Sequence, residues 1–214
     1  MVVMVLTAQS LYAGAPVSPR AGFSAGLGVN YLSQRDVVDM VNGGYSPSKR
    51  LDNYHAAVDF SGAFVLPLGA RLALRFEYAY VLNTVNTAGP LGPGEFTTTV
   101  HMPSVIVEYS IVDGGLYNLS AGIGGGYHPG RLSIDYGPIK DTYTANGPGF
   151  VVMLVGNSAI GEDLFIHLAG TMRLGMLGEL RNANGQSPGK GSDGSPATLG
   201  TFSVGARIGL SYYL

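Results

Sequence analysis

The sequence predicts an all-β fold, an eight-stranded antiparallel up-and-down transmembrane β-barrel. Beyond residue 20, apolar and polar residues alternate with a period of two, as expected for strands with two unlike faces. Only 12% of the 214 residues are charged, against roughly 25% in soluble domains. The large apolar residues and the 33 glycines tend to lie on opposite faces of the predicted strands. A sheet of this kind suits a closed ring with a narrow interior and an apolar exterior.

The composition excludes several other classes of protein. A hydrophobic content of 46% and a formal net charge of −2 are the reverse of what disordered chains show. The absence of cysteine excludes a disulfide scaffold, and the absence of a basic excess argues against a nucleic-acid partner. After the N-terminus, no apolar run reaches the roughly 18 residues that a membrane-spanning helix requires.

The N-terminal segment is typical of an export signal. Residues 1–8 are largely apolar, and Ala13, Gly14 and Ala15 have the small-x-small form of a cleavage site. No Lys or Arg precedes the apolar stretch. We expect residues 1–20 to be a signal peptide that lacks its basic first segment, and residues 21–214 to form the barrel domain. The alternative is an apolar N-terminus of a cytosolic protein.

Strands are predicted wherever the alternation persists. The clearest strand places Leu74, Phe76 and Tyr78 on one side and Arg75 and Glu77 on the other. One segment, 150–155, is apolar on both faces, so its facing stays open. Helical spacing is absent at useful length, and we expect no helix. The predicted strands are 23–31, 58–66, 72–82, 103–111, 117–127, 150–155, 164–174 and 202–214.

The connections between these strands alternate in length. Tight turns rich in Gly, Pro and Asp are predicted at 66–69, 112–115 and 161–163. Long polar loops are predicted at 33–53, 84–95, 131–146 and 180–196. This alternation is typical of a meander whose long loops all leave one end of the barrel.

Two architectures fit such a meander: a soluble barrel with an apolar interior, such as a lipocalin, or a membrane barrel with an apolar exterior. The interior of an eight-stranded barrel is just wide enough for side chains to fill it. The face of small residues therefore fits inside, whereas the face of large residues would overpack it. This argument favours the membrane barrel.

The charged residues of the strands support the same choice. A charge that faced lipid at the bilayer midplane would cost about 2–4 kcal/mol, and the apolar face carries none. Equal numbers of acids and bases can neutralise one another inside the ring. The predicted interior charge network consists of Asp59, Arg75, Glu77, Glu108, Arg173 and Arg207.

Aromatic residues lie near several strand ends on the apolar face. Membrane barrels carry girdles of aromatic residues at both interfaces of the bilayer. The alternative is that these residues are only good strand formers. The predicted aromatic girdle consists of Phe23, Tyr31, Tyr80, Tyr109, Tyr117, Tyr127 and Tyr212.

With the glycine-rich strand 122–127 and the alternating final segment 204–214, the chain resembles small bacterial outer-membrane proteins of the OmpA-like and OmpX-like eight-stranded barrel group. The resemblance implies a monomer in the outer membrane of a Gram-negative bacterium, surrounded by lipid and lipopolysaccharide. It also implies that the barrel-assembly machinery reads a signal in the last strand, for which Ile208, Leu210, Tyr212 and Leu214 match the expected positions.

The sequence offers little catalytic chemistry. His55, His101, His128 and His167 show no metal-binding spacing, and the run 122–126 is not followed by the helix that a dinucleotide site needs. We therefore expect no catalytic residue, no metal and no cofactor. Some outer-membrane barrels that modify lipid A use a His and a Ser, but the parity of His101 and Ser104 puts them on opposite faces.

The expected function is that of a non-enzymatic outer-membrane barrel with a structural or surface-interaction role, whose exposed loops meet an extracellular ligand. One alternative is a narrow pore or hydrophobic-solute channel resembling the OmpW type, which inward-facing Val151, Met153 and Val155 would allow. A second alternative is an enzyme that modifies lipid A.

Overall fold

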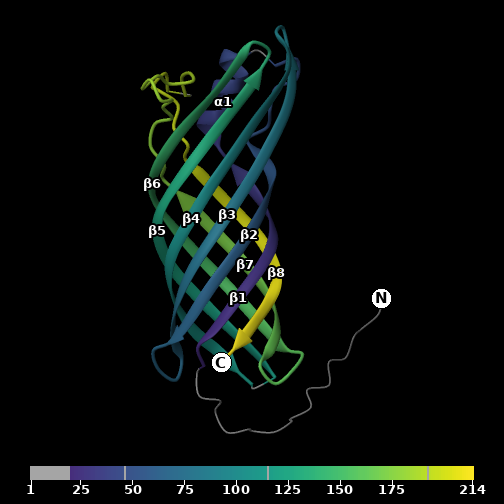
Figure 1. Cartoon of the computed structure of the whole chain (residues 1–214), viewed down its shortest axis with the longest axis vertical. Helices are drawn as coiled ribbons and strands as arrows, with labels where there is room; N and C mark the ends of the chain where they lie inside the picture. The colour runs from purple at the N-terminus through teal and green to yellow at the C-terminus, as the bar shows by residue number, and fades with distance from the viewer. Residues whose placement is uncertain (1–19, 46, 115, 192) are drawn as a thin grey trace, which may run out of the picture.

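The computed structural model describes residues 20–45, 47–114, 116–191 and 193–214. Eight antiparallel strands pair in chain order, and β8 pairs with β1 to close the barrel (Figure 1). The predicted fold class is therefore confirmed. The strands are β1 (Gly22–Ser33), β2 (Tyr54–Pro67), β3 (Leu72–Gly89), β4 (Gly92–Asp113), β5 (Tyr117–Tyr136), β6 (Ile139–Ala159), β7 (Leu164–Gly175) and β8 (Thr201–Tyr213).

The large apolar side chains face outward, so the soluble-barrel alternative is wrong. On β5, Ile123 and Tyr127 are 66% and 60% exposed, while the neighbouring glycines point inward. A Cβ at Gly126 would lie 1.8 Å from the carbonyl oxygen of Pro103 in β4, so only glycine fits there. Strand β6, whose facing was open, turns Val151 and Met153 inward and Phe150 outward.

The outward apolar residues form a belt around the barrel. The belt ends, on the side of the barrel where β1 ends and β2 begins, where the outward residues become polar. On β3 the outward residues are apolar or aromatic up to Leu82 and then change to Thr84 and Asn86. On β5 they run from Tyr117 to Tyr127 before Arg131 follows. Ten residues at about 3.3 Å each, tilted by about 40°, span about 25 Å, which matches the apolar band of membrane barrels.

Within the described ranges, the structure contains no helix that is both long enough and apolar enough to span a membrane.

Two predicted loops are strands instead. The segments 84–95 and 131–146 continue the hairpins β3–β4 and β5–β6 almost to their tips, at residues 90–91 and 137–138. Four strands thereby project beyond the belt as a sheet (Figure 1). The outward face of this sheet meets water, so it carries Thr and Ser where the membrane part carries apolar residues. This change of outward residue type made the strands look like polar loops.

The connection between β1 and β2 contains a helix, so the expectation of no helix is wrong. Helix α1 (Arg35–Gly44) buries Val37, Val38, Met40 and Val41. These positions share one helical face, because residues three and four apart lie on the same side. The helix has only ten residues and lies within a polar connection, so its apolar residues repeat over too few turns to predict a helix.

We predict that a charge in the belt destabilises the barrel and that the same charge above the belt does not. Val105→Arg places a guanidinium on the lipid-facing side of β4 near the middle of the belt, where it should lower the free energy of unfolding by about 2–4 kcal/mol. Chemical unfolding of the protein in lipid vesicles measures this change.

Thr97→Arg is the matched control, because Thr97 faces outward on the same strand but lies above the belt. Its effect should stay below about 1 kcal/mol. Equal effects of the two substitutions would contradict the assignment of the belt.

Candidate functional site

The interior of the barrel is filled along its length by different side chains. We call the end that carries α1 the loop end, and the end where β1 begins and β8 finishes the terminus end (Figure 1). Apolar side chains fill the loop end, charged side chains fill the middle, and a cavity opens at the terminus end. This arrangement decides whether the barrel is a conduit or a closed scaffold.

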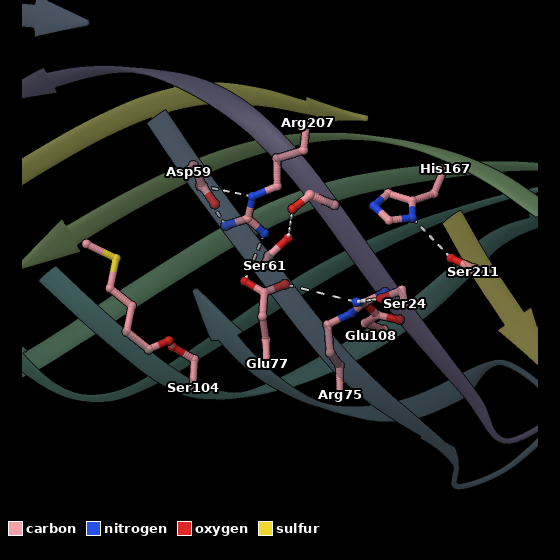
Figure 2. A network of polar contacts seen from close by, with 12 residues as sticks. Ser24, Asp59, Ser61, Arg75, Glu77, Ser104, Glu108, His167, Arg207 and Ser211 are labelled. Carbon is pink, nitrogen blue, oxygen red and sulfur yellow. Dashed lines mark hydrogen bonds and ion pairs between the residues drawn. The ribbon is translucent and has the colours of Figure 1, made fainter. Parts of the chain in front are cut away.

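The centre of the ring holds a buried ion layer formed by Asp59, Glu77, Arg173 and Arg207. Arg173 donates from Nη1 to Asp59 Oδ2 at 2.9 Å and from Nη2 to Glu77 Oε1 at 2.5 Å. Arg207 donates to the same two acids, at 2.8 Å to Asp59 and 3.0 Å to Glu77, and Figure 2 shows its guanidinium reaching toward both carboxylates. Arg173 on β7 and Arg207 on β8 therefore link these two strands to β2 and β3 through the interior of the ring.

A second pair extends this layer toward the terminus end. Arg75 Nε donates to Glu108 Oε1, and Arg75 Nη1 donates to Ser24 Oγ at 2.9 Å. The Arg75 guanidinium also lies 4.0 Å from Glu77, which links the two groups (Figure 2). The structure thus brings all six predicted interior charges into one network, and none of the six residues is more than 6% exposed.

The composition of this network follows from its burial. Charges withdrawn from water are tolerated only when they are paired and hydrogen-bonded. Three guanidinium groups face three carboxylates, so the network carries no net charge. Asn30 also donates to Asp59 Oδ2 at 2.9 Å. Asn30 was not predicted to belong to the network, although the alternation along β1 places its side chain on the inward face.

The histidines lie at separate places in the barrel. His167 Nδ1 lies 3.2 Å from Ser211 Oγ (Figure 2), and Ser211 donates to Asn157 Oδ1 at 3.2 Å. His128 Nε2 lies 3.4 Å from Ser104 Oγ inside the ring and is fully buried. His101 faces outward, where its Nδ1 lies 2.5 Å from Tyr78 Oη.

His101 and Ser104 are therefore not brought together, in agreement with their opposite parity. His55 lies near the start of β2, with its Nε2 atom buried and unbonded among the described residues. In the described part of the chain, no group of three or more His, Cys, Asp or Glu residues is placed to hold a metal ion.

An apolar plug closes the loop end. We define it as the buried face of α1, the segment 177–199 and the inward residues of the projecting sheet. Met40 and Val41 of the helix, Leu180 and Leu199 of the segment, and Phe96 of β4 belong to this cluster, and none is more than 3% exposed. The interior at this end is therefore packed with side chains, as in a protein core.

Hydrogen bonds hold the plug at both ends of the helix. Asp36 accepts from Thr198 Oγ1 at 2.6 Å, which ties the first turn of α1 to the segment that precedes β8. Tyr136 donates to the carbonyl oxygen of Tyr45 at 2.9 Å, just after the helix ends. Burial raises the pKa of the inward phenol of Tyr143 to about 12.

All seven residues of the predicted girdle face outward. Six of them are at least 47% exposed, and Tyr80 is half-buried against Phe60 and His101. Ile208, Leu210 and Tyr212 line the outward face of β8, and Leu214 follows the strand. Their roles at the membrane interfaces and in assembly stay predictions. The predicted signal peptide, residues 1–20, falls almost entirely outside the described residues.

Comparison with solved structures identifies the same architecture. The chain superimposes on Neisserial surface protein A with a TM-score of 0.54 at 11% identity, covering 92% of this chain and 99% of that one. It superimposes on the attachment invasion locus protein Ail of Yersinia pestis, solved with the heparin analogue sucrose octasulfate, with a TM-score of 0.51 at 8% identity, covering 91% and 98%. No protein-family model and no curated protein sequence matches the chain. The fold is that of the small eight-stranded outer-membrane β-barrels.

We predict that the ion layer is sensitive to the loss of a single partner. Asp59→Ala removes the carboxylate that Arg173 and Arg207 share, leaving buried guanidinium groups short of counter-charge. The free energy of unfolding should fall by about 3–5 kcal/mol. Equilibrium unfolding of the refolded barrel in vesicles measures it.

Asp163→Ala is the control, since it breaks the exposed pair between Arg20 and Asp163. Exposed ion pairs contribute about 0–1 kcal/mol. If the two variants had the same free energy of unfolding, the ion layer would not contribute to the stability of the barrel.

Proposed function

We propose that this chain is a non-enzymatic integral protein of a Gram-negative outer membrane, which anchors a rigid surface for contact outside the cell. The projecting sheet of β3, β4, β5 and β6 carries this proposal. Its outward face is polar and open, while its inward residues are part of the plug and pack against α1 and the segment that precedes β8. A surface held in this way is preorganised, which lowers the entropic cost of binding a partner.

The proposed orientation puts the loop end outside the cell and both termini in the periplasm. Outer-membrane barrels have short periplasmic turns and longer extracellular connections. Here the turns at residues 68–71 and 160–163 are short, whereas α1 and the segment 176–200 lie at the other end. The apolar belt then fills the hydrocarbon layer, with membrane lipid as its permanent partner.

The outward face of the sheet presents ordered polar side chains. Thr84, Thr97, Ser133 and Thr142 stand in register across four strands, and the hydroxyls of Thr84 and Thr97 lie 3.0 Å apart. Hydroxyl groups both donate and accept hydrogen bonds, so such a row suits a polar extracellular partner.

The next row lies nearer the belt and includes Thr99, Arg131 and Thr144. A guanidinium flanked by hydroxyls suits the phosphate and sugar groups of lipopolysaccharide at the membrane surface. A solved barrel of similar fold is named for attachment and invasion and holds a sulfated sugar analogue. That example supports surface contact as a role for this fold.

The filled interior supports a closed scaffold over a narrow pore. Val151, Met153 and Val155 do face inward, but they pack with Ile106 and Ala169 in a buried cluster. The ion layer and the plug then lie in series along the same axis. For the lipid A alternative, His101 and Ser104 lie on opposite sides of the wall. We propose further that the chain acts as a monomer, inserted by the barrel-assembly machinery through the outward face of β8.

We predict that the projecting sheet is accessible to a protein outside intact cells. The chain has no cysteine, so Thr142→Cys gives a single thiol on the exposed face of β6. A membrane-impermeant biotin maleimide followed by streptavidin should label this variant on intact cells, because a partner of protein size can reach the sheet.

Ala70→Cys is the control, since Ala70 is exposed in the turn at the terminus end. It should react only after the outer membrane is permeabilised. The reverse pattern would overturn the proposed orientation. If neither variant were labelled on intact cells, the proposed surface role would be wrong.

We predict that the purified barrel does not conduct ions. The plug and the ion layer both block the axis, so planar-bilayer recordings should show no stable channel steps. A porin of 16 strands recorded in the same bilayers is the positive control. Reproducible unitary steps from this protein would favour the pore.

A further inference from the structure

The terminus end contains a cavity that the scaffold role leaves unused. It has a volume of about 210 Å³ and lies inside the ring, between the ion layer and the open mouth. Every strand except β1 contributes at least one lining residue. Because the middle of the barrel is filled, this cavity is a pocket with a closed floor.

The depth of the pocket carries no unpaired charge. Glu108 reaches it from the floor, but this carboxylate is bound to Arg75. At the rim, Arg20 pairs with Asp163 at 2.6 Å, while Arg71, Asp113 and Glu162 are exposed to solvent, and Arg71 donates to Tyr109 Oη at 3.3 Å. A charged ligand would find no free counter-charge at the bottom, so the pocket suits a neutral one.

The walls combine hydrogen-bonding groups with an aromatic surface. Ser110, Asn118, Ser120 and Asn157 bring hydroxyl and amide groups from three neighbouring strands. Asn157 donates to Asn118 Oδ1 at 2.7 Å, which fixes the orientation of both amides. On the next two strands of the ring, β7 and β8, the rings of Phe165 and Tyr213 meet edge to face with centroids 5.2 Å apart.

We propose that this pocket binds a neutral, sugar-sized polyhydroxylated solute from the side of the membrane where the termini lie. The volume equals about seven water molecules at roughly 30 Å³ each, which is room for one hexose ring. The hydroxyl groups of a hexose match the serine and asparagine side chains, and its C–H faces match the aromatic wall. Fixed amides and a neutral floor select against ions, and polar walls select against a purely apolar ligand.

Saturation-transfer-difference NMR tests this binding, with glucose and N-acetylglucosamine as probes and the whole barrel in lipid nanodiscs. Binding should saturate with a Kd of about 1–10 mM, as expected for a ligand of this size. Glucuronate and glucosamine, which carry a charge, should bind at least about fivefold more weakly. Tighter binding of either charged sugar, or no saturable binding of the neutral ones, overturns the proposal.

A pair of variants locates the site. Ser120→Phe fills the pocket and should abolish the signal, whereas Ala121→Phe puts the same ring on the outward face one residue later and should leave Kd unchanged. Ser120→Ala, which removes only the hydroxyl, should weaken binding severalfold and serves if the larger variant does not fold. Equal binding by all three variants would place the sugar elsewhere and refute the assignment. This outcome is independent of the surface role, which the labelling of intact cells tests.

Discussion

The narrow bore of an eight-stranded ring constrains everything that lies inside this protein. Side chains on the inner face compete for the space that one barrel radius leaves. A Cβ at inward-facing Gly149, for example, would lie 2.0 Å from the ring of the buried His128. Large residues are therefore displaced to the outside, where hydrocarbon accepts them. The outward belt and the glycine-rich interior are two consequences of one geometry.

The same constraint explains why charges can be buried here at all. In a narrow ring, inward side chains of strands that are not neighbours meet at the centre, so Arg173 and Arg207 reach Asp59 and Glu77. The resulting cross-links join β2 and β3 to β7 and β8 through the middle of the barrel. Because the ion layer blocks the bore, the ends of the barrel become separate compartments, a packed plug at one side and an open pocket at the other.

The projecting sheet shows how the wall of the barrel continues beyond the apolar belt. Strand pairing continues past the belt, and only the outward residues change, from apolar side chains such as Leu82 to polar ones such as Thr84. The inward apolar residues of this sheet pack against α1 and the segment that precedes β8 within the plug, so they do not meet water. Stiffness outside the membrane therefore comes from the same hydrogen-bonded ladder that crosses it.

Alternation, together with the loop lengths and the size of the residues on each face, was enough to predict the closed ring, its apolar exterior and its six inward charges, because parity along a strand is a local property. The pairing of those charges, with Arg207 meeting an acid 148 residues away, depends on how the ring closes, and no local pattern contains that information. The length of the hairpins was not predicted, because strands with polar outward residues lack the apolar alternation. The short helix α1 was not predicted either, because its ten residues have a buried face only through contact with Leu180 and Leu199. Local period thus fixes which side of the wall a residue occupies, while contacts between distant segments fix what it touches there.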